Sequence, residues 1–511
     1  MPIDQIGENC GICGAFSDGR NSGYELYQMM LDLQHRGQAG AGISTYNGDR
    51  KIIIRTYKGQ GRVPEVFGGT NEEDFRKIME KYGGPVGIGH TRYGTSGGLS
   101  SRHVQPFERV HGVKYRWFTF GFNGHIANRY VLEERVKDMG YHLMLDTDTE
   151  LMMHLLSKYI SDTGGDDHVE VFRRISEDFD GAFNITFLDA EGNLIAMRDP
   201  RGFRPLATVE TETGSYAASE SSALFRMGAY DIHHVKPGEM AVLTENGIEY
   251  KNYTTPKRKS LCFFEYLYFA SVNSEIDGLP VYEARKRCGE ELAKLETENI
   301  NGDEWVIIPV PNTSRPIANS YAKSLGFPDI YDEGLIASGK GRTFIDDGDR
   351  SQKVKKKFLP IPSILRDKKV VVIDDSIVRS TTMRTLTNYH LREIAGVKEI
   401  HVRIATPPIV APCYYGIDMK SFEELIAAPH FNDLEDGKLP DEVLDQMADY
   451  LKADSLIYMT HDSLLRALKM DRSQLCMACL NRDYPTDYAK ELDRQAYDRW
   501  DKKCRGCHAS E

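Results

Sequence analysis

Four features are missing from this sequence of 511 residues, and each absence argues against a class of protein. No run approaches the roughly 18 apolar residues that a membrane-spanning helix needs, and Met1 to Asn9 has neither the basic nor the apolar region of a secretory signal. A net charge of −12 disfavours a nucleic-acid partner held by bulk electrostatics. Nine cysteines spread over the chain do not suggest a secreted disulfide framework. We therefore expect a cytoplasmic protein whose cysteines are metal ligands or nucleophiles.

The composition is globular, with 41% apolar and 27% charged residues, and the length allows two or three domains. Residues 10–250 alternate apolar and polar positions and contain two helical stretches, 26–33 and 149–159, which predict an α+β layered domain. After a polar linker at 251–259, strands and helices alternate, which predicts an α/β domain with a mostly parallel sheet. The predicted strands are 51–55, 117–120, 183–188, 305–310, 370–373 and 399–405, and the later predicted helices are 283–298 and 317–325.

A buried strand followed by two carboxylates organises the second half. Residues 370–373 are four β-branched residues, and Asp374 and Asp375 follow them directly. Residues 379–382 then open a predicted helix whose N-terminus suits a phosphate group. The carboxylates would repel phosphate, but they suit ribose hydroxyls or a Mg²⁺ ion that carries pyrophosphate. On composition alone, a strand ending in an ordinary capped turn explains the segment equally well.

The residue order at 374–382, Asp-Asp-Ser-Ile-Val-Arg-Ser-Thr-Thr, resembles the phosphoribosylpyrophosphate (PRPP) motif of type I phosphoribosyltransferases. It is specifically similar to that of the glutamine PRPP amidotransferases. The resemblance implies an α/β type I phosphoribosyltransferase domain, in which Ser314 joins Asp374 and Asp375 around Mg²⁺. The PRPP-binding residues that it implies are Asp374, Asp375, Ser376, Arg379, Ser380, Thr381, Thr382 and, in a basic lid segment, Arg342.

A series of short motifs follows Cys10-Gly11-Ile12-Cys13-Gly14 in the first half. In this order they resemble the N-terminal-nucleophile (Ntn) glutamine amidotransferase domain. The resemblance implies an α+β Ntn-hydrolase sandwich (αββα) with Cys10 as the nucleophile. The motifs lie at residues 34–38, 90–93, 122–125, 146–150 and 198–206.

The chemistry explains why Cys10 should become the first residue. A thiol with a pKa of about 8.5 needs a neighbouring base, and an α-amine with a pKa of about 7.7–8.0 is well matched. Cleavage before Cys10 would supply both groups, so we expect residues 1–9 to be a propeptide. We assign the competing Cys13 to structure.

The same resemblance assigns the substrate contacts of this half. The side-chain amide of Asn123 and the backbone N–H of Gly124 form the oxyanion hole. Arg92 binds the α-carboxylate of glutamine, for which its planar fork is suited, and Asp148 binds the α-ammonium group.

Four departures from the family concern mainly the second half. Residues 337–340, Ala-Ser-Gly-Lys, replace a Lys-Asn-Arg-Tyr stretch, and the segment after Ile345 is shorter than expected. Ser380 stands where the phosphate loop has glycine, which adds a side chain where the backbone must approach phosphate closely. Ala39 replaces an acidic residue. A diverged paralogue with altered transferase activity is therefore an alternative.

Cys476 and Cys479 are a chelating pair by their spacing. One possible completion uses Cys504 and Cys507 and gives a zinc site, although the 24 residues between Cys479 and Cys504 exceed the ordinary span.

The completion that we favour uses Cys262 and Cys413. Their surroundings resemble the iron–sulfur subgroup of the family, in which four such cysteines hold a [4Fe–4S] cluster. Cys288 is predicted to be a helix residue, and Cys504, Cys507 and His508 belong either to a loose tail or to a second metal site.

Together the resemblances imply an enzyme that hydrolyses glutamine at Cys10 and transfers the ammonia to PRPP. The products are pyrophosphate and 5-phosphoribosylamine, at the start of purine nucleotide synthesis. We expect Mg²⁺ and a [4Fe–4S] cluster as cofactors, purine nucleotides as feedback inhibitors, and a homo-oligomer, either dimer or tetramer, with no nucleic-acid or membrane partner. Two alternatives are a non-enzymatic sensor of glutamine or PRPP and a glutaminase with another acceptor. The expected divisions are the propeptide 1–9, a glutaminase domain 10–250, a transferase domain 251–470 and a tail 471–511.

Overall fold

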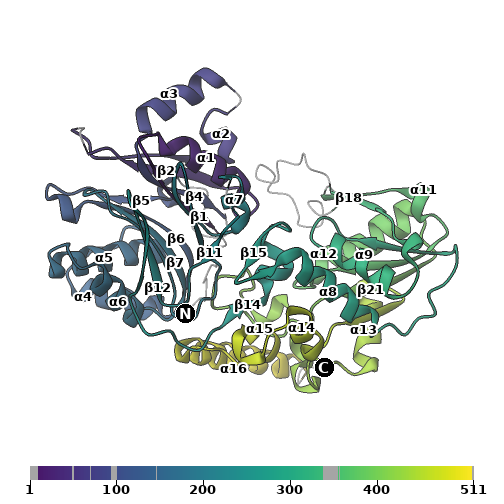
Figure 1. Ribbon diagram of the computed structural model, residues 1–511. Coiled ribbons are helices and arrows are strands. Elements are labelled where there is room, and N and C mark those ends of the chain that lie inside the picture. Colours follow the sequence, from purple (N-terminus) through teal and green to yellow (C-terminus); the bar gives the residue numbers. More distant parts are fainter. Residues whose placement is uncertain are drawn as a thin grey trace.

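The computed structural model describes residues 10–48, 51–69, 71–93, 101–145, 147–228, 230–337, 355 and 357–508, the last five without their side chains. In the first half, two antiparallel sheets lie face to face (Figure 1). The seven-stranded sheet has the order β11 (His233–His234), β9 (Ala207–Thr211), β10 (Gly214–Ala218), β1 (Gly11–Ser17), β4 (Val86–Arg92), β2 (Gly40–Tyr46) and β3 (Ile54–Gln60). The six-stranded sheet has the order β13 (Gly247–Asn252), β12 (Glu239–Thr244), β8 (Leu194–Arg198), β7 (Gly181–Asp189), β6 (Phe118–Ile126) and β5 (Phe107–Arg109).

Helices cover the outer face of each sheet, and three apolar cores separate the four layers. Ile12, Ile88 and Leu194 belong to the core between the sheets. α1 (Ser22–Asp32) packs on the seven-stranded sheet, and α5 (Asp148–Thr163) and α6 (His168–Asp178) pack on the six-stranded sheet. Every residue of β6 and β7 is buried, because these strands are covered on both faces. This arrangement confirms the predicted αββα sandwich. The other helices of this half are α2 (Val63–Val66), α3 (Glu72–Tyr82), α4 (Arg129–Asp138) and α7 (Ser221–Phe225).

The second half is built on a parallel sheet with helices on both faces. Its strand order is β17 (Trp305–Pro309), β20 (Lys369–Asp374), β21 (Glu399–Ile404) and β22 (Ser455–Tyr458). Val371 and Ile373 pack into one core, and Val370 and Val372 into another, because successive side chains of a strand point to opposite faces. The predicted α/β fold is confirmed. The helices are α8 (Val281–Ala293), α9 (Arg315–Ser324), the short α11 (Pro362–Leu365), α12 (Ser380–Thr385) with its π-helical continuation Leu386–Ala395, α13 (Asp441–Leu451) and α14 (His461–Leu468). A short ladder joins β18 (Leu335–Ala337) to β19 (Phe358–Pro360).

Most predicted elements are present, with shifted ends. The strand predicted at 51–55 begins only at Ile54, and Ile52 is 52% exposed. The helix predicted at 283–298 ends at Ala293. None of the helices in the described part of the chain is long and apolar enough to cross a membrane.

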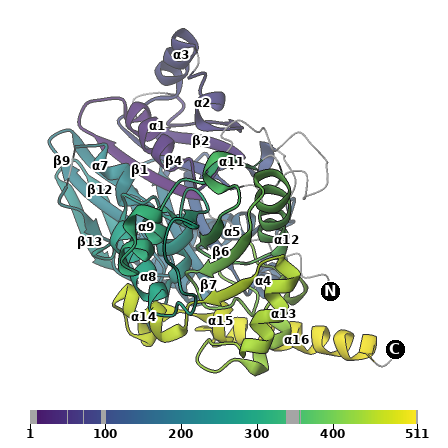
Figure 2. The same cartoon turned by 90° about the vertical axis from the view of Figure 1, so that its right-hand side faces the viewer.

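The C-terminal tail returns to the junction of the two halves. β14 (Leu261–Cys262) pairs in parallel with β23 (Leu475–Cys476), which is followed by α15 (Ala478–Asn481) and α16 (Asp487–His508). In both views α16 runs along the lower edge of the molecule (Figures 1 and 2). The backbone N–H of Tyr488 donates to Asp180 Oδ2 at 3.1 Å, so α16 also contacts the first half.

Candidate active sites and cysteine centre

Cys10 directly precedes β1, beside the strand that carries Arg92. Gly11 pairs with Thr91 across the antiparallel β1–β4 ladder, so its neighbour Cys10 lies next to Arg92. Cys10 is fully buried, and Arg92 is 2% exposed. The backbone carbonyl of Cys10 accepts from Arg36 Nε at 3.4 Å, which fixes the start of the strand. The sequence motifs of Arg36 and Arg92 thus meet at the predicted nucleophile.

Asn123 and Gly124 lie on β6 of the facing sheet. Within the described residues, neither the amide nitrogen nor the amide oxygen of fully buried Asn123 has a hydrogen-bond partner. Buried amides are normally paired, so this one has a donor to offer a substrate. A Cβ atom at Gly124 would lie 1.9 Å from the carbonyl oxygen of Ala182 on β7, which excludes any side chain there. These features suit the predicted oxyanion hole.

Asp148 is the first residue of α5, where Thr147 caps the helix. Its Oδ2 accepts from the backbone N–H of Ile126 at 3.0 Å and lies 3.1 Å from His125 Nδ1, while Oδ1 lies 3.8 Å from Arg129 Nε. Burial alone would raise the pKa of Asp148, but these neighbours, His125 foremost, hold it below its ordinary value. Asp148 is therefore an anion, as binding of an ammonium group requires.

Cys13 belongs to the core between β1 and α1, not to this site. It packs with Met30, and burial raises the pKa of its thiol far above the usual range. Such a thiol is unreactive, in keeping with a structural role.

The paired aspartates stand at the carboxyl end of β20, where open α/β sheets bind ligands. Asp374 Oδ1 accepts from Ser314 Oγ at 3.3 Å, and Asp375 accepts from the hydroxyls of Thr313 and Ser376, the latter at 2.8 Å. Burial raises the pKa of both carboxyls, and the charge of Asp375 raises that of Asp374 further. Two buried like charges with hydroxyl oxygens beside them form a donor set that suits a divalent cation.

A cavity of about 680 Å³ opens in front of the aspartates. Of the residues predicted to bind PRPP, those that line it are Asp374, Asp375, Ser376, Arg379 and Thr382.

Two other predicted PRPP ligands, Ser380 and Thr381, do not line this cavity. Ser380 opens α12, and its hydroxyl lies 3.5 Å from the hydroxyl of Tyr450 on α13. Arg342 and most of the predicted lid lie outside the described residues. Arg379 Nη2 lies 2.7 Å from Glu424 Oε2, and Arg379 Nη1 lies 3.5 Å from Asp418 Oδ2.

The wall of this cavity includes residues of the first half that the motifs did not assign to it. His35 and Tyr93 line it together with Arg285 and Tyr268. Tyr93 directly follows Arg92, so the two predicted sites adjoin. His35 and Tyr93 lie in the motifs at 34–38 and 90–93, but no local signal assigns them to the second site, because only the packing of the two halves brings them there.

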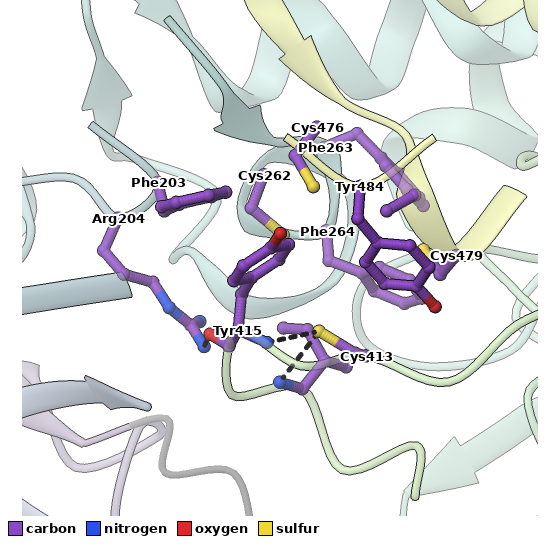
Figure 3. Close-up of a pocket in the computed structure, with 12 residues that line it drawn as sticks. Phe203, Arg204, Cys262, Phe263, Phe264, Cys413, Tyr415, Cys476, Cys479 and Tyr484 are labelled. Atoms are coloured by element: carbon purple, nitrogen blue, oxygen red, sulfur yellow. Dashed lines mark hydrogen bonds between the residues drawn. The ribbon is translucent and has the colours of Figure 1, made fainter. Parts of the chain in front are cut away.

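Four cysteines from three segments line one enclosed cavity (Figure 3). The β14–β23 register places Cys262 opposite Cys476, and Cys413 and Cys479 complete the set. Cys413 Sγ accepts from the backbone N–H groups of Tyr415 and Ile417 at 3.3 and 3.4 Å. These are the cysteines predicted to hold a cluster.

Burial raises the pKa of all four thiols, to about 12 for Cys262, and the neighbouring thiols add to the effect at Cys476 and Cys479. Converging thiolates are therefore unfavourable without a positively charged group, and a thiolate-ligated iron–sulfur cluster fits this donor set. Among the described residues, no three His, Cys, Asp or Glu side chains lie close enough to share one metal ion.

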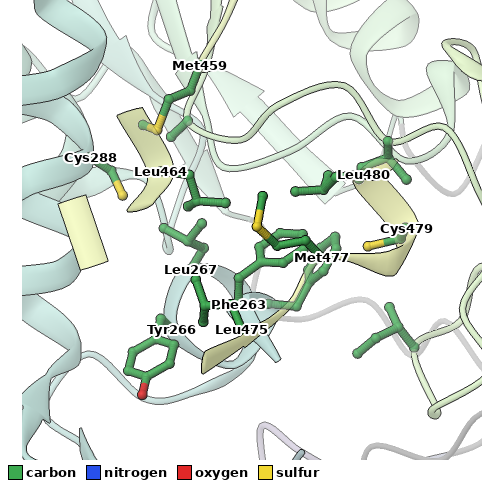
Figure 4. Close-up of a cluster of buried hydrophobic side chains, with 14 of the residues drawn as sticks. Phe263, Tyr266, Leu267, Cys288, Met459, Leu464, Leu475, Met477, Cys479 and Leu480 are labelled. Carbon is green, nitrogen blue, oxygen red and sulfur yellow. The ribbon is translucent and has the colours of Figure 1, made fainter. Parts of the chain in front are cut away.

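The remaining described cysteine, Cys288, belongs to the adjoining core. Its thiol points from α8 toward a cluster that includes Leu464, Leu267 and Met477 (Figure 4). Burial raises its pKa to about 12. Its place in α8 confirms the predicted helix position.

The chain is similar to known proteins in each half separately and over its whole length. Residues 91–226 match a family model described as a glutamine amidotransferase domain, and residues 281–407 match one described as a phosphoribosyl transferase domain. The amidophosphoribosyltransferase of Pyrococcus horikoshii is 40% identical over 94% of this chain and 97% of its own length. That of Methanothermobacter thermautotrophicus is 36% identical over 96% and 97%.

Two solved structures are similar over nearly the whole chain. Glutamine PRPP amidotransferase from B. subtilis, complexed with ADP and GMP, superposes with a TM-score of 0.78 at 30% identity and covers 94% of this chain and 98% of its own. A structure described as the allosteric regulatory enzyme of purine biosynthesis has a TM-score of 0.79 at 32% identity, with 94% and 97% covered. Fold and matches thus define an enzyme that joins a glutamine amidotransferase domain to a phosphoribosyltransferase domain. The chain belongs to the amidophosphoribosyltransferase family.

Proposed function

We propose that this protein hydrolyses glutamine to glutamate and ammonia at Cys10 and that the ammonia displaces pyrophosphate from PRPP, forming 5-phosphoribosylamine. The observation that carries this proposal is the junction of the two sites. Tyr93 and His35, from the glutaminase motifs, form part of the wall of the cavity that holds Asp374 and Asp375. Ammonia released at the first site, beside Arg92, therefore has only a short distance to travel to the second site.

In the first reaction the α-amine of Cys10, freed by removal of residues 1–9, takes the thiol proton as the sulfur attacks the amide carbon. The Asn123 amide and the Gly124 N–H stabilise the oxyanion. Arg92 and Asp148 hold the two ends of the amino-acid group. When the tetrahedral intermediate collapses, the protonated α-amine of Cys10 gives its proton to the amide nitrogen, the C–N bond breaks and ammonia leaves a thioester. Water then hydrolyses the thioester, which releases glutamate and restores the thiol.

In the second reaction, Asp374, Asp375 and Ser314 would hold Mg²⁺, which neutralises charge on the pyrophosphate leaving group. Thr382 and Ser376, with the N-terminal turn of α12, contact the phosphate and ribose groups. Thr381, Arg342 and the backbone N–H of Ser380 complete the proposed set of PRPP ligands.

Cys262, Cys413, Cys476 and Cys479 would hold a [4Fe–4S] cluster with a structural role. The proposed divisions are 10–250, 251–470 and 471–511, with the cluster tying the last to the second. The ADP and GMP bound to the B. subtilis protein support regulation of this protein by purine nucleotides. A cytoplasmic homo-oligomer is part of the same proposal.

Release of pyrophosphate from PRPP, measured with glutamine and with ammonium salts, tests the proposal. The wild type should use both donors. Cys10→Ala should lose glutamine-dependent release and keep ammonia-dependent release, because only the first site needs the thiol. Cys13→Ala, three residues further along but in the core, should keep both.

Two outcomes would contradict the proposal. Equal loss of both activities in Cys10→Ala would refute the two-site assignment. Absence of pyrophosphate release with either donor would favour the regulatory alternative.

A further inference from the structure

Part of the strand that carries the proposed oxyanion hole has, within the described residues, no strand on one of its edges. β5 pairs with β6 only as far as Phe120, so the rest of β6, which ends at Ile126, extends past it. Backbone N–H and C=O groups of a strand alternate between its two edges, and those of Phe122, Gly124 and Ile126 point to the edge that β5 leaves open. The N–H of Gly124 therefore belongs to this open edge.

Side chains bind the backbone on either side of Gly124 at the open edge. The N–H of Phe122 donates to Gln105 Oε1 at 2.7 Å. Further along the edge, the N–H of Ile126 donates to Asp148 Oδ2 at 3.0 Å. Gly124 lies midway between these two anchored residues, so its position along the edge is fixed from both sides.

The carbonyl group of Phe122 is anchored as well. His90 Nε2 lies 3.2 Å from this oxygen, and burial lowers the pKa of His90 to about 3, so its ring is neutral. Because a carbonyl oxygen only accepts, the proton of the neutral ring is on Nε2. His90 is fully buried and Gln105 is 1% exposed, so neither hydrogen bond can be exchanged easily for one to water.

Gln105 continues the register of β5 without continuing its main-chain hydrogen bonds. The register of β5 on β6 places Gln105 opposite Phe122. Pro106 has no N–H to donate, and the carbonyl oxygen of Gln105 lies against Gly42 on β2, where a Cβ atom would be only 2.4 Å away. The side-chain amide of Gln105 therefore supplies the acceptor that the main chain does not.

Contacts with β3 hold the segment that carries Gln105. Lys58 Nζ donates to the carbonyl of Pro106 at 2.9 Å, and Thr56 Oγ1 donates to Glu108 Oε2 at 2.6 Å. The segment is thus fixed independently of Phe122, as an anchor for the open edge must be.

We propose that Gln105 is a positioning residue of the glutaminase reaction, which acts through the Phe122 peptide on the oxyanion hole. The anchored peptide keeps the Asn123 amide and the Gly124 N–H at the place where the oxyanion forms. This inference rests on the roles proposed for Cys10, Asn123 and Gly124. The oxyanion exists only after the thiol has attacked, so loss of the anchor should slow the reaction and leave the binding of glutamine nearly unchanged.

Glutamate formation in the presence of PRPP tests the inference. Gln105→Met, which is similar in size but has no amide, should lower kcat by about ten- to a hundredfold and change KM by less than about threefold, as expected when an interaction of the transition state is lost. Gln105→Ala, which adds no new contact, should show the same loss. Gln105→Glu keeps an acceptor oxygen and should recover at least about a third of the wild-type kcat. Ammonia-dependent pyrophosphate release should stay at the wild-type level in all three variants.

A matched control lies at the other end of β1. Asn21 Oδ1 accepts from the backbone N–H of Gly23 at 2.9 Å, and its Nδ2 donates to the carbonyl of Met79 at 2.8 Å. Asn21 follows Ser17, the last residue of β1, which is about 24 Å along the strand from Cys10. Asn21→Leu removes a similar contact between an amide and the backbone, and it should lower the Tm without changing kcat.

A second measurement reports on the tetrahedral state directly. L-Glutamate γ-semialdehyde has an aldehyde in place of the amide of glutamine. The Cys10 sulfur bonds to the aldehyde carbon and the thiol proton passes to the oxygen, which then lies in the oxyanion hole. The Ki of this compound should rise at least about tenfold in Gln105→Met. The Kd of glutamine, measured in proteins that also carry Cys10→Ala, should not change.

Three results would overturn the inference: a wild-type kcat in Gln105→Met, an equal loss of kcat in Gln105→Glu, or an unchanged Ki for the aldehyde. None of them would touch the proposed function, which fails only if the Cys10 and ammonia tests fail.

Discussion

At the scale of single residues, the transferase site places two carboxylates in an unfavourable environment. Burial and the charge of Asp375 raise the pKa of Asp374 above its value in an unfolded chain. The folded state therefore binds this proton more tightly, so the carboxyl stabilises the fold at low pH and loses that effect as pH rises through the raised pKa. A substrate site that binds a cation needs these buried carboxylates, although they destabilise the folded protein at neutral pH when no cation is bound.

The substitution Asp374→Asn tests both effects of this carboxyl, the one on stability and the one on cation binding. With a chelator present, the wild-type Tm should fall as pH rises above about 4, the pKa of an aspartate in an unfolded chain. The Tm of Asp374→Asn should fall less and should be higher than the wild-type Tm at neutral pH. Added Mg²⁺ should remove the difference, and ammonia-dependent transfer should be lost in the variant while glutaminase activity remains. Asp445→Asn, exposed on α13, is the control and should follow the wild-type Tm. Equal Tm values for Asp374→Asn and the wild type at every pH would contradict the prediction.

At the scale of elements, the local pattern predicted most strands and helices, and long-range contacts decided their ends. The helix predicted to reach 298 ends at Ala293, and Glu296 beyond it binds Arg403 on β21 at 2.7 Å. Similarly, Ser380 was expected to crowd the phosphate loop. In the fold it occupies the first turn of α12 without a left-handed backbone, and its hydroxyl faces Tyr450, seventy residues away. No local pattern contains such partners.

This orientation of Ser380 predicts that a substitution at 380 weakens PRPP binding less than a substitution at 382. Ser380→Gly should change KM for PRPP less than about threefold, because the side chain does not line the cavity, at a stability cost of about 1 kcal/mol or less for glycine in a helix. Thr382→Ala removes a hydroxyl that does line it and should raise KM at least about tenfold, the equivalent of about 1.4 kcal/mol. Ammonia-dependent initial rates measure both values. A larger effect at Ser380 than at Thr382 would mean that the loop rearranges when PRPP binds.

At the scale of the whole molecule, a buried charge network joins the two halves. Glu265, which follows β14, accepts from Arg36 at 2.8 and 2.9 Å and from Arg204 at 2.9 Å. Arg36 also binds Glu220, and Arg204 donates to the carbonyl of Tyr415 at 3.0 Å. Removing one member of such a network would leave an uncompensated buried charge, so each member holds its partners in place. The network therefore connects the two halves between the start of β1 and the cysteine cavity.

This network also marks the limit of what the sequence could reveal. Arg36 and Arg204 lie in motifs that predicted the glutaminase half, and their pairing with Glu265 appears in no motif. The individual catalytic residues could be predicted because short segments carry them. The shared wall of the two sites could not, because it depends on how two separately patterned halves pack.

The cysteine cavity lies at that junction and provides the last prediction. Anaerobically purified protein should be brown and contain iron and sulfide at roughly four each per chain. Cys262→Ser and Cys476→Ser should each remove the colour and lower the Tm, because β14 and β23 hold the tail to the second half and ligation is linked to folding. Cys288→Ala, buried outside the cavity, should keep the colour, as should Cys504→Ser and Cys507→Ser. Colourless protein with about one zinc per chain, lost on changing Cys504 but not Cys262, would instead assign the metal to the tail and leave Cys262 and Cys413 as buried thiols.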